Sequence, residues 1–264
     1  MCELLKYPRT PHLQGSKLQP GDEDLEQVRL ADLVGRHVVI EEKVDGANCA
    51  VSFDETGALK LQSRGHYLEG GPREEQFALL KTWASCHSGL FWDLLGDRYV
   101  MYGEWLYAKH TVYYDALPHY FLEFDIFDRQ SETFLSTELR HLMLHGSPVH
   151  SVPVLHEGDG KALKDPRSWL RPSLYKSVGW KSSLEAQAGQ LGQNLAQVLK
   201  ETDSSDMAEG LYIKVEEDGV VKERLKWLRY DFLQALTESG SHWRDRPLFP
   251  NGLAEGVDLF GGPA

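Results

Sequence analysis

The chain has 264 residues and is 41% hydrophobic, which is enough to bury a full core in one large domain, or in one domain with a small appendage. The net charge of −12 argues against a protein that coats nucleic acid non-specifically, because such binding draws on clustered lysines and arginines; a local basic groove remains compatible with it. Three cysteines cannot all pair, and we expect neither a secretory leader nor a membrane span. The composition therefore predicts a cytoplasmic protein with no membrane partner.

Residues 1–36 are rich in proline and glycine and contain an acidic stretch at residues 22–26. This pattern predicts a loop-rich entry that leads into a short helix. We expect this segment to be a packed cover without a chemical role. The main domain should then occupy residues 37–230, and residues 231–264 should form a short tail.

Residues 38–64 show apolar and polar residues in alternation, interrupted by Asp45-Gly46 and by Glu55-Thr56-Gly57. Alternation of this kind predicts three strands, and the Asp-Gly pair is typical of a tight hairpin turn. We therefore predict an antiparallel sheet in which Lys43 ends the first strand.

The next stretch, residues 73–95, has apolar residues at helical spacing and predicts one long amphipathic helix, with Trp83 and Trp92 in the core. Two further strands are expected at residues 99–107 and 120–127. The loop between them, residues 108–115, mixes charged and aromatic side chains, a composition that suits contact with RNA or an exposed polar loop.

The last third of the chain predicts short helices and one clear hairpin. We expect a helix after Ser136 and a polar helix over residues 183–201. The hairpin should span residues 209–227 and turn at Glu217-Asp218-Gly219. A final helix at residues 232–237 should precede a proline- and glycine-rich end.

Lys43 is the candidate nucleophile, because its position at a strand end before a turn lets the amine project into a cleft. An amine attacks phosphorus only when it is deprotonated, so partial burial and nearby cationic groups or a metal would be needed to favour the neutral form. A surface lysine before a hairpin turn would show the same short pattern.

An ordered series of motifs follows Lys43 along the chain. The motifs read Glu41-Glu42-Lys43-Val44-Asp45-Gly46-Ala47-Asn48, Ser63-Arg64-Gly65, Tyr102-Gly103-Glu104-Trp105, Phe121-Leu122-Glu123-Phe124-Asp125, Glu209-Gly210-Leu211-Tyr212-Ile213-Lys214 and Arg224-Leu225-Lys226-Trp227. The series resembles the covalent nucleotidyltransferase superfamily of ATP-dependent ligases and mRNA capping enzymes. With Asn48 it looks most like the RNA ligases of that superfamily.

This resemblance implies an α+β fold, namely a nucleotidyltransferase (ATP-grasp-like ligase) domain with antiparallel sheets flanked by helices. The residues after Arg229 are too few for the C-terminal oligonucleotide-binding barrel that DNA ligases and capping enzymes append, so we expect no such barrel.

The resemblance also assigns roles to individual residues. It implies that Lys43 carries the AMP, that Asn48 handles the RNA and that Glu209 is the carboxylate nearest the metal. The residues expected to bind the nucleotide are Glu41, Glu42, Arg64, Glu104, Phe124, Arg224 and Lys226. Alternation along the second hairpin strand places Lys222, Arg224 and Lys226 on one face. Arg224 stands where the family usually has lysine, which leaves its role open.

The implied reaction is ATP-dependent joining of an RNA 5′-phosphate to a 3′-hydroxyl through lysyl-AMP, a reaction that suits RNA repair. Its expected cofactors are ATP and Mg²⁺, with Mn²⁺ as a substitute. An RNA end-healing kinase or phosphatase is a candidate partner. The loop around Lys109, His110 and Tyr113, together with Lys176 and Lys181, would distinguish RNA from DNA.

Three alternatives stand beside this interpretation. DNA ligases and GTP-dependent capping enzymes usually carry arginine where this chain has Asn48. A non-catalytic protein that binds RNA ends is disfavoured, because Lys43, Glu104, Glu209 and Lys226 are all present.

Overall fold

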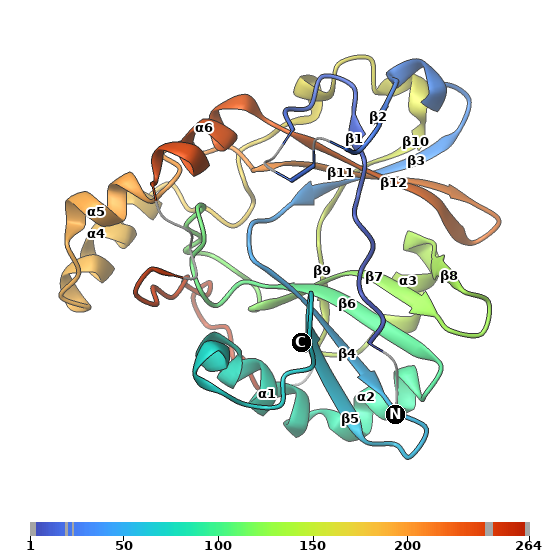
Figure 1. The fold of residues 1–264 in the computed structure, drawn as a ribbon, viewed down its shortest axis with the longest axis horizontal. Coiled ribbons are helices and arrows are strands. Elements are labelled where there is room, and N and C mark those ends of the chain that lie inside the picture. The colour runs from blue at the N-terminus through green and yellow to red at the C-terminus, as the bar shows by residue number, and fades with distance from the viewer. Residues whose placement is uncertain (1–3, 19–20, 23, 241–244, 262–264) are drawn as a thin grey trace.

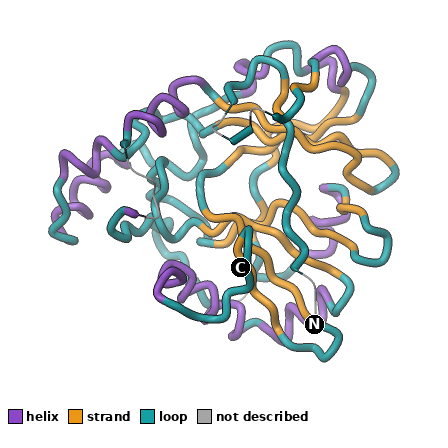
Figure 2. The backbone as a smooth tube through the Cα atoms, in the orientation of Figure 1, coloured by secondary structure: helices purple, strands orange, loops and turns teal. Residues whose placement is uncertain are grey.

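The computed structural model describes residues 4–18, 21–22, 24–240 and 245–261. In this part of the chain the strands form one continuous hydrogen-bonded sheet, which divides into an upper and a lower half (Figure 1). Helices lie around the outside of the strands (Figure 2). Most of the strand pairs are antiparallel, so the architecture is the predicted α+β type.

The upper half is built around the strand that ends at Lys43. Its order is β10 (Val154–Asp159), β3 (His37–Lys43), β11 (Gly210–Glu217) and β12 (Val220–Leu228), all antiparallel. Two short strands, β1 (His12–Leu13) and β2 (Gln27–Val28), extend it through parallel pairing beside β12. The apolar run Val38–Ile40 is fully buried, and Val38 and Ile40 pack in a core cluster with Leu33 and Leu163.

The lower half carries the other motif strands. Its order is β8 (Thr133–Leu135), β7 (Phe121–Asp128), β6 (Tyr99–Trp105), β4 (Ala47–Phe53) and β5 (Leu59–Ser63), with β9 (His150–Ser151) parallel to β7. Strand β8 pairs with both β7 and β12, so it joins the two halves.

The predicted hairpin between β3 and β4 is wrong, although both strands exist. β3 pairs with β10 and β11, whereas β4 pairs with β5 and β6, so residues 44–46 cross from one half to the other. A Cβ atom on Gly46 would lie 2.8 Å from the carbonyl oxygen of Trp105, which explains why this crossing needs glycine. The Asp-Gly pair therefore marks a close passage of the backbone and not a hairpin turn.

The long helix predicted over residues 73–95 is interrupted. The chain instead forms η2 (Pro72–Phe77), α1 (Ala78–Cys86) and α2 (Ser88–Leu95), with a break at His87. His87 leaves helical geometry with φ −104° and ψ 11°, and its Nδ1 lies 3.0 Å from the backbone oxygen of Trp83. Trp83 is fully buried as predicted. Trp92, which was also predicted to lie in the core, is 40% exposed and only packs edge to face on Phe53.

The predicted helix over residues 183–201 is also divided, into α4 (Trp180–Gln190) and α5 (Leu195–Lys200). Gly192 adopts φ +64° between them, and the Asn194 side chain accepts a hydrogen bond from the backbone N–H of Gln197 to begin α5. The remaining helices are α3 (Thr137–Leu144), α6 (Tyr230–Glu238), η1 (Leu30–Leu33), η3 (Gly160–Ala162) and η4 (Pro166–Trp169). No helix in the described ranges is both long enough and apolar enough to cross a membrane.

The hairpin formed by β11 and β12 agrees with the prediction. Asp218 and Gly219 form its turn with φ values of +53° and +76°. Positive φ at both positions is the signature of the tight turn that suits the twist of paired strands.

The N-terminal segment links the two halves and is more than a cover. The backbone oxygen of Leu5 accepts hydrogen bonds from Gln62 and Tyr102 of the lower half. Further along, the backbone oxygen of Pro11 accepts one from Lys226 of the upper half. Figure 1 shows this segment running across the front of the molecule between the two halves.

Candidate active site

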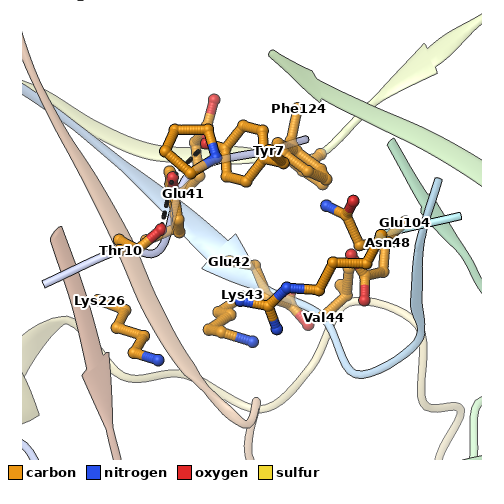
Figure 3. Close-up of a pocket in the computed structure, with 14 residues that line it drawn as sticks. Tyr7, Thr10, Glu41, Glu42, Lys43, Val44, Asn48, Glu104, Phe124 and Lys226 are labelled. Carbon is orange, nitrogen blue, oxygen red and sulfur yellow. Dashed lines mark hydrogen bonds between the residues drawn. The ribbon is translucent and has the colours of Figure 1, made fainter. Parts of the chain in front are cut away.

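One pocket is lined by motif residues from both halves of the sheet. Its wall draws on β3, β4, β6, β7, β11 and β12 and on the N-terminal segment (Figure 3). The lining residues are Tyr7, Pro8, Thr10, Glu41, Glu42, Lys43, Val44, Asn48, Arg64, Glu104, Phe124, Val152, Tyr212 and Lys226. The pocket therefore unites motifs that lie as far apart in the sequence as Glu41 and Lys226.

Lys43 projects from the end of β3 and pairs with Glu209. Its Nζ lies 2.8 Å from Oε1 of Glu209, and the strand register explains why, since Lys43 is opposite Gly210. A Cβ atom on Gly210 would lie only 2.1 Å from the carbonyl oxygen of Trp227. Glycine after Glu209 therefore lets β11 and β12 approach each other closely beside the Lys43–Glu209 pair.

The charges around Lys43 keep its amine protonated in the absence of a ligand. Burial alone would lower the pKa of Lys43, but the carboxylates of Glu209, Glu104 and Asp45 raise it above its ordinary value. Burial in turn raises the pKa of Glu104 to about 8 and that of Glu209 to about 7, against the opposing charge of Lys43. The expected depression of the Lys43 pKa is therefore not a property of the nucleotide-free protein.

Aromatic side chains form the end of the pocket opposite the two lysines, as Figure 3 shows for Tyr7, Phe124, Lys43 and Lys226. The rings of Tyr7 and Phe124 meet edge to face, with centroids 5.1 Å apart and planes at 86°. The Tyr7 hydroxyl lies 2.5 Å from that of Tyr212. This end offers flat apolar surfaces of the kind that stack on a base.

Behind this end, five fully buried charged side chains join β3 to β7, β11 and α3. Arg140 makes two hydrogen bonds to Glu123, at 2.7 and 2.8 Å, and one to Glu41 at 2.7 Å. Lys214 completes the set with ion pairs to Glu41 at 3.0 Å and to Asp125 at 3.2 Å. Glu41 is therefore a lining residue whose carboxylate is fully buried and committed to two cations.

The remaining motif residues of β3, β4 and β5 differ in how they face the pocket. The Glu42 carboxylate accepts hydrogen bonds from the Ser173 hydroxyl at 2.6 Å and from the backbone N–H of Leu174 at 3.2 Å. Asn48 lies directly across from Glu104 in the β4–β6 pairing, and the exposed Arg64 lies at the rim. The structure therefore brings Asn48 and Arg64 to the pocket, while the Glu42 side chain braces the neighbouring loop.

The two cationic residues of β12 that were expected to bind the nucleotide have different surroundings. Lys226 lines the pocket, and its Nζ lies 2.5 Å from Oδ2 of Asp22. The Arg224 guanidinium instead lies over the rings of Phe134 and Tyr7, at 3.8 and 5.3 Å from their centroids. Arg224 is therefore not among the residues that line the pocket, and the predicted basic stripe contributes Lys226 alone.

Several residues that line the pocket were not predicted from the sequence. Tyr7, Pro8 and Thr10 belong to the segment interpreted as a cover without chemistry, and no periodic pattern or motif distinguishes them. Tyr212 had a usable signal, because it lies inside a motif and two residues before Lys214 on a strand.

The predicted RNA-contacting loop is wrong. Lys109, His110 and Tyr113 have exposed fractions of only 7%, 3% and 1%. The Lys109 amine donates a hydrogen bond to the backbone oxygen of Glu201, at 3.0 Å, and Lys176 donates one to the backbone oxygen of Ser205. The Lys109 and Lys176 amines thus satisfy internal carbonyl groups, whereas Lys181 is exposed beside Trp180 and its contact with RNA stays a prediction.

The described ranges contain no cluster of three or more His, Cys, Asp or Glu side chains that could hold a metal ion. They do contain two carboxylates close to Lys43, those of Glu104 and Glu209. Oε2 of Glu209 is buried without a hydrogen-bond partner. Magnesium typically takes one or two protein carboxylates together with substrate phosphates, so these residues fit a metal that arrives with a nucleotide.

A comparison with protein families matches residues 36–228 to the RNA ligase family. The chain belongs to the RNA ligase family. The matched range begins just before β3 and ends with β12, so it contains every motif strand of the pocket. A comparison with curated proteins finds no match.

Solved RNA ligase structures share the fold. A Naegleria gruberi RNA ligase mutant with ATP and Mn is 17% identical, with a TM-score of 0.51 over 79% of this chain and 54% of its own. A second Naegleria gruberi mutant, with AMP and Mn, is 16% identical, with a TM-score of 0.51 over 87% and 62%. An archaeal ATP-dependent RNA ligase is 16% identical, with a TM-score of 0.50 over 86% and 49%.

These likenesses confirm the predicted nucleotidyltransferase fold. The chain spans about half to three fifths of the length of these solved relatives. The family range includes Lys43 and most of the residues that line its pocket.

Proposed function

We propose that this protein is an ATP-dependent RNA ligase that joins RNA 5′-phosphate and 3′-hydroxyl ends. The observation that carries the proposal is the position of the Lys43 amine, which lies in a pocket of an RNA ligase family fold between carboxylates, a second lysine and an aromatic end. The two Naegleria gruberi structures described above were with ATP or AMP and manganese, which supports a nucleotide as the ligand of this pocket.

In the first step the Lys43 nitrogen forms a bond to the α-phosphorus of ATP, and the bond to pyrophosphate breaks. The amine must first lose a proton, and the positive charge of Lys226 and of a metal bound with the nucleotide would favour that loss. Lys226 would bind the phosphate whose negative charge increases in the transition state. The product is lysyl-AMP.

The other lining residues would position the nucleotide. Phe124 and Tyr7 provide surfaces for the base, and Glu104 can accept hydrogen bonds from ribose hydroxyls, as the family resemblance implies. Glu209 is the residue best placed to hold Mg²⁺ or Mn²⁺. When bound, the metal would neutralise phosphate and carboxylate charge.

In the second step an oxygen of the RNA 5′-phosphate attacks the AMP phosphorus, and the Lys43 nitrogen leaves. In the third step the 3′-hydroxyl attacks the activated 5′-phosphorus, and AMP leaves. Asn48 lies beside Glu104 at the pocket and can both donate and accept hydrogen bonds, so we assign it to the RNA ends. Because the reaction needs a 5′-phosphate and a 3′-hydroxyl, we also propose that an end-healing kinase or phosphatase prepares the RNA, in the cytoplasm.

The direct test is covalent labelling with ATP that carries ³²P in its α-phosphate, in the presence of Mg²⁺. Wild type and Lys200→Ala should retain the label through denaturation, since Lys200 is exposed on α5, and Lys43→Ala should not. Label from GTP in place of ATP would support the capping alternative. If Lys43→Ala labels as strongly as wild type, the proposed chemistry is wrong.

A sealing assay separates the RNA and DNA interpretations. The substrates are nicked duplexes with pre-adenylylated 5′ ends, and only the two nucleotides on the 3′-hydroxyl side change from ribose to deoxyribose. We expect sealing to fall at least about tenfold, equivalent to roughly 1.4 kcal/mol of lost transition-state stabilisation. Equal sealing of an all-DNA nick would favour a DNA ligase.

A further inference from the structure

The Lys226 amine is paired with a carboxylate from outside the motif set. Oδ2 of Asp22 lies 2.5 Å from Nζ of Lys226 and 3.1 Å from Nε2 of His12, and Oδ1 lies 3.2 Å from the Arg9 guanidinium. Burial opposes ionisation, but the hydrogen bonds from Lys226, His12 and Arg9 lower the pKa of Asp22 to about 2. Asp22 is therefore an anion at neutral pH.

This carboxylate is held by a frame that also positions Lys226. His12 is fully buried and lies opposite Lys226 in the β1–β12 pairing. Nδ1 of His12 lies 2.8 Å from the Ser16 hydroxyl, which accepts a hydrogen bond from the backbone N–H of Leu228 at 2.9 Å. The contact between Asp22 and Lys226 is thus part of the packed structure and not a chance meeting of exposed side chains.

A carboxylate at this distance offers Lys226 what a phosphate oxygen would offer, namely a negative acceptor in a charge-assisted hydrogen bond. Lys226 and Asp22 are both largely shielded, with side-chain exposed fractions of 11% and 13%. A triphosphate that reaches the same amine brings further negative charge close to Asp22. The two anions therefore cannot both occupy the amine without strong repulsion.

We propose that Asp22 competes with the phosphates of the nucleotide for Lys226 and so sets the affinity of the pocket for ATP. This inference rests on the proposed function, since it takes ATP as the ligand. Lys226 is paired while the pocket is empty, and the phosphates must displace the Asp22 carboxylate.

Arg9 gives the displaced carboxylate a second partner. The Arg9 guanidinium bonds to Asp22, to both carboxylate oxygens of Asp24 and to the backbone oxygen of Gly21. Asp22 can therefore leave Lys226 and remain paired with Arg9. This keeps the competition reversible, because neither state leaves an isolated charge.

The test measures equilibrium binding in a Lys43→Ala background, which removes the covalent step. ATP and adenosine are titrated into this protein and into the same protein with Asp22→Asn, which preserves the size of the side chain and removes its charge. We expect ATP to bind about tenfold more tightly, or about 1.4 kcal/mol, if the amine is available in about one molecule in ten before the substitution. Adenosine has no phosphate, so its affinity should not change, and this also shows that the variant is folded.

Two further variants complete the design. Asp24→Asn is the matched control, since Asp24 pairs only with Arg9 among the contacts described, and it should leave ATP affinity within about twofold. With Lys226→Ala added, Asp22→Asn should not change the affinity for ATP, because the amine for which Asp22 and the phosphates compete is gone.

ATP binding that is unchanged or weaker in the Asp22→Asn protein overturns this inference while leaving the proposed function intact. ATP binding that is absent both with and without Asp22→Asn overturns the proposed function and this inference together.

Discussion

Replacing Glu104 with glutamine should stabilise the nucleotide-free protein above pH 7. Glu104 lies on β6 beside Lys43, and burial raises its pKa from 4.5 to about 8 even though the Lys43 charge opposes this. The folded protein therefore keeps a proton on Glu104 at a pH where the unfolded chain has released it. Glutamine keeps the shape and the polarity without the ionisation.

The sign and the size of the effect follow from proton linkage. Because the folded pKa is raised, the contribution of Glu104 to stability is fully present below pH 4.5 and is lost as the pH rises toward 8. At 1.36 kcal/mol per unit, the shift from 4.5 to about 8 corresponds to about 4 to 5 kcal/mol. Glu104 lines a pocket that water can enter, so we expect about half of this, roughly 2 kcal/mol, between pH 5 and pH 8.

The assay is urea unfolding of wild type, Glu104→Gln and Glu185→Gln at several values between pH 5 and pH 8. Glu185 is exposed on α4, so its variant should follow wild type throughout. The free energy of unfolding of Glu104→Gln should exceed that of wild type by an amount that grows with pH. Parallel curves for wild type and Glu104→Gln would show that the pocket does not destabilise the charged carboxylate.

Two other substitutions probe different parts of the site. Asn48→Ala should still form lysyl-AMP but should seal nicked RNA poorly, and equal loss of both steps in parallel labelling and sealing assays would remove Asn48 from its assigned role. Arg140→Met should lower the free energy of unfolding by about 3 to 5 kcal/mol, because it leaves the buried carboxylates of Glu41 and Glu123 short of a partner. The exposed control Arg29→Met should change little in the same urea titration, and an equally small change for Arg140→Met would show that the buried network does not stabilise the fold.

The motif set could be placed from the sequence because strand geometry is local and periodic. Alternation located β3, β4, β6, β7, β11 and β12, and the Asp218-Gly219 turn fixed the register of the last hairpin. Glu209 reaches Lys43 through a different pairing, in which Gly210 of β11 lies opposite Lys43 of β3. The motif strands and the last hairpin were therefore within reach of sequence reasoning, but this contact was not.

Features that depend on non-local contacts were not within reach. The pairing of β3 with β10 and β11, in place of β4, joins segments that lie far apart in the sequence. Lys109 lies in a loop whose composition suits RNA contact, yet its amine donates a hydrogen bond to the backbone oxygen of Glu201. A sequence window records which groups can make hydrogen bonds but not which partners the fold brings to them.

The site contains two groups of charges, a buried network around Arg140 and Lys214 and the contacts of Glu209 and Lys226, and we expect only the second group to rearrange when a ligand binds. Arg140 and Lys214 are enclosed by carboxylates on fully buried side chains, so moving either one would leave an uncompensated charge in the interior. That cost fixes β3 just behind its reactive end. Beside Lys43, by contrast, Glu209 has a carboxylate oxygen without a hydrogen-bond partner, and Lys226 is held by a carboxylate that has another partner within reach. A nucleotide and its metal can rearrange these outer contacts without disturbing the inner ones, so ligand charge can act at Lys43 while the strand that carries Lys43 stays in place.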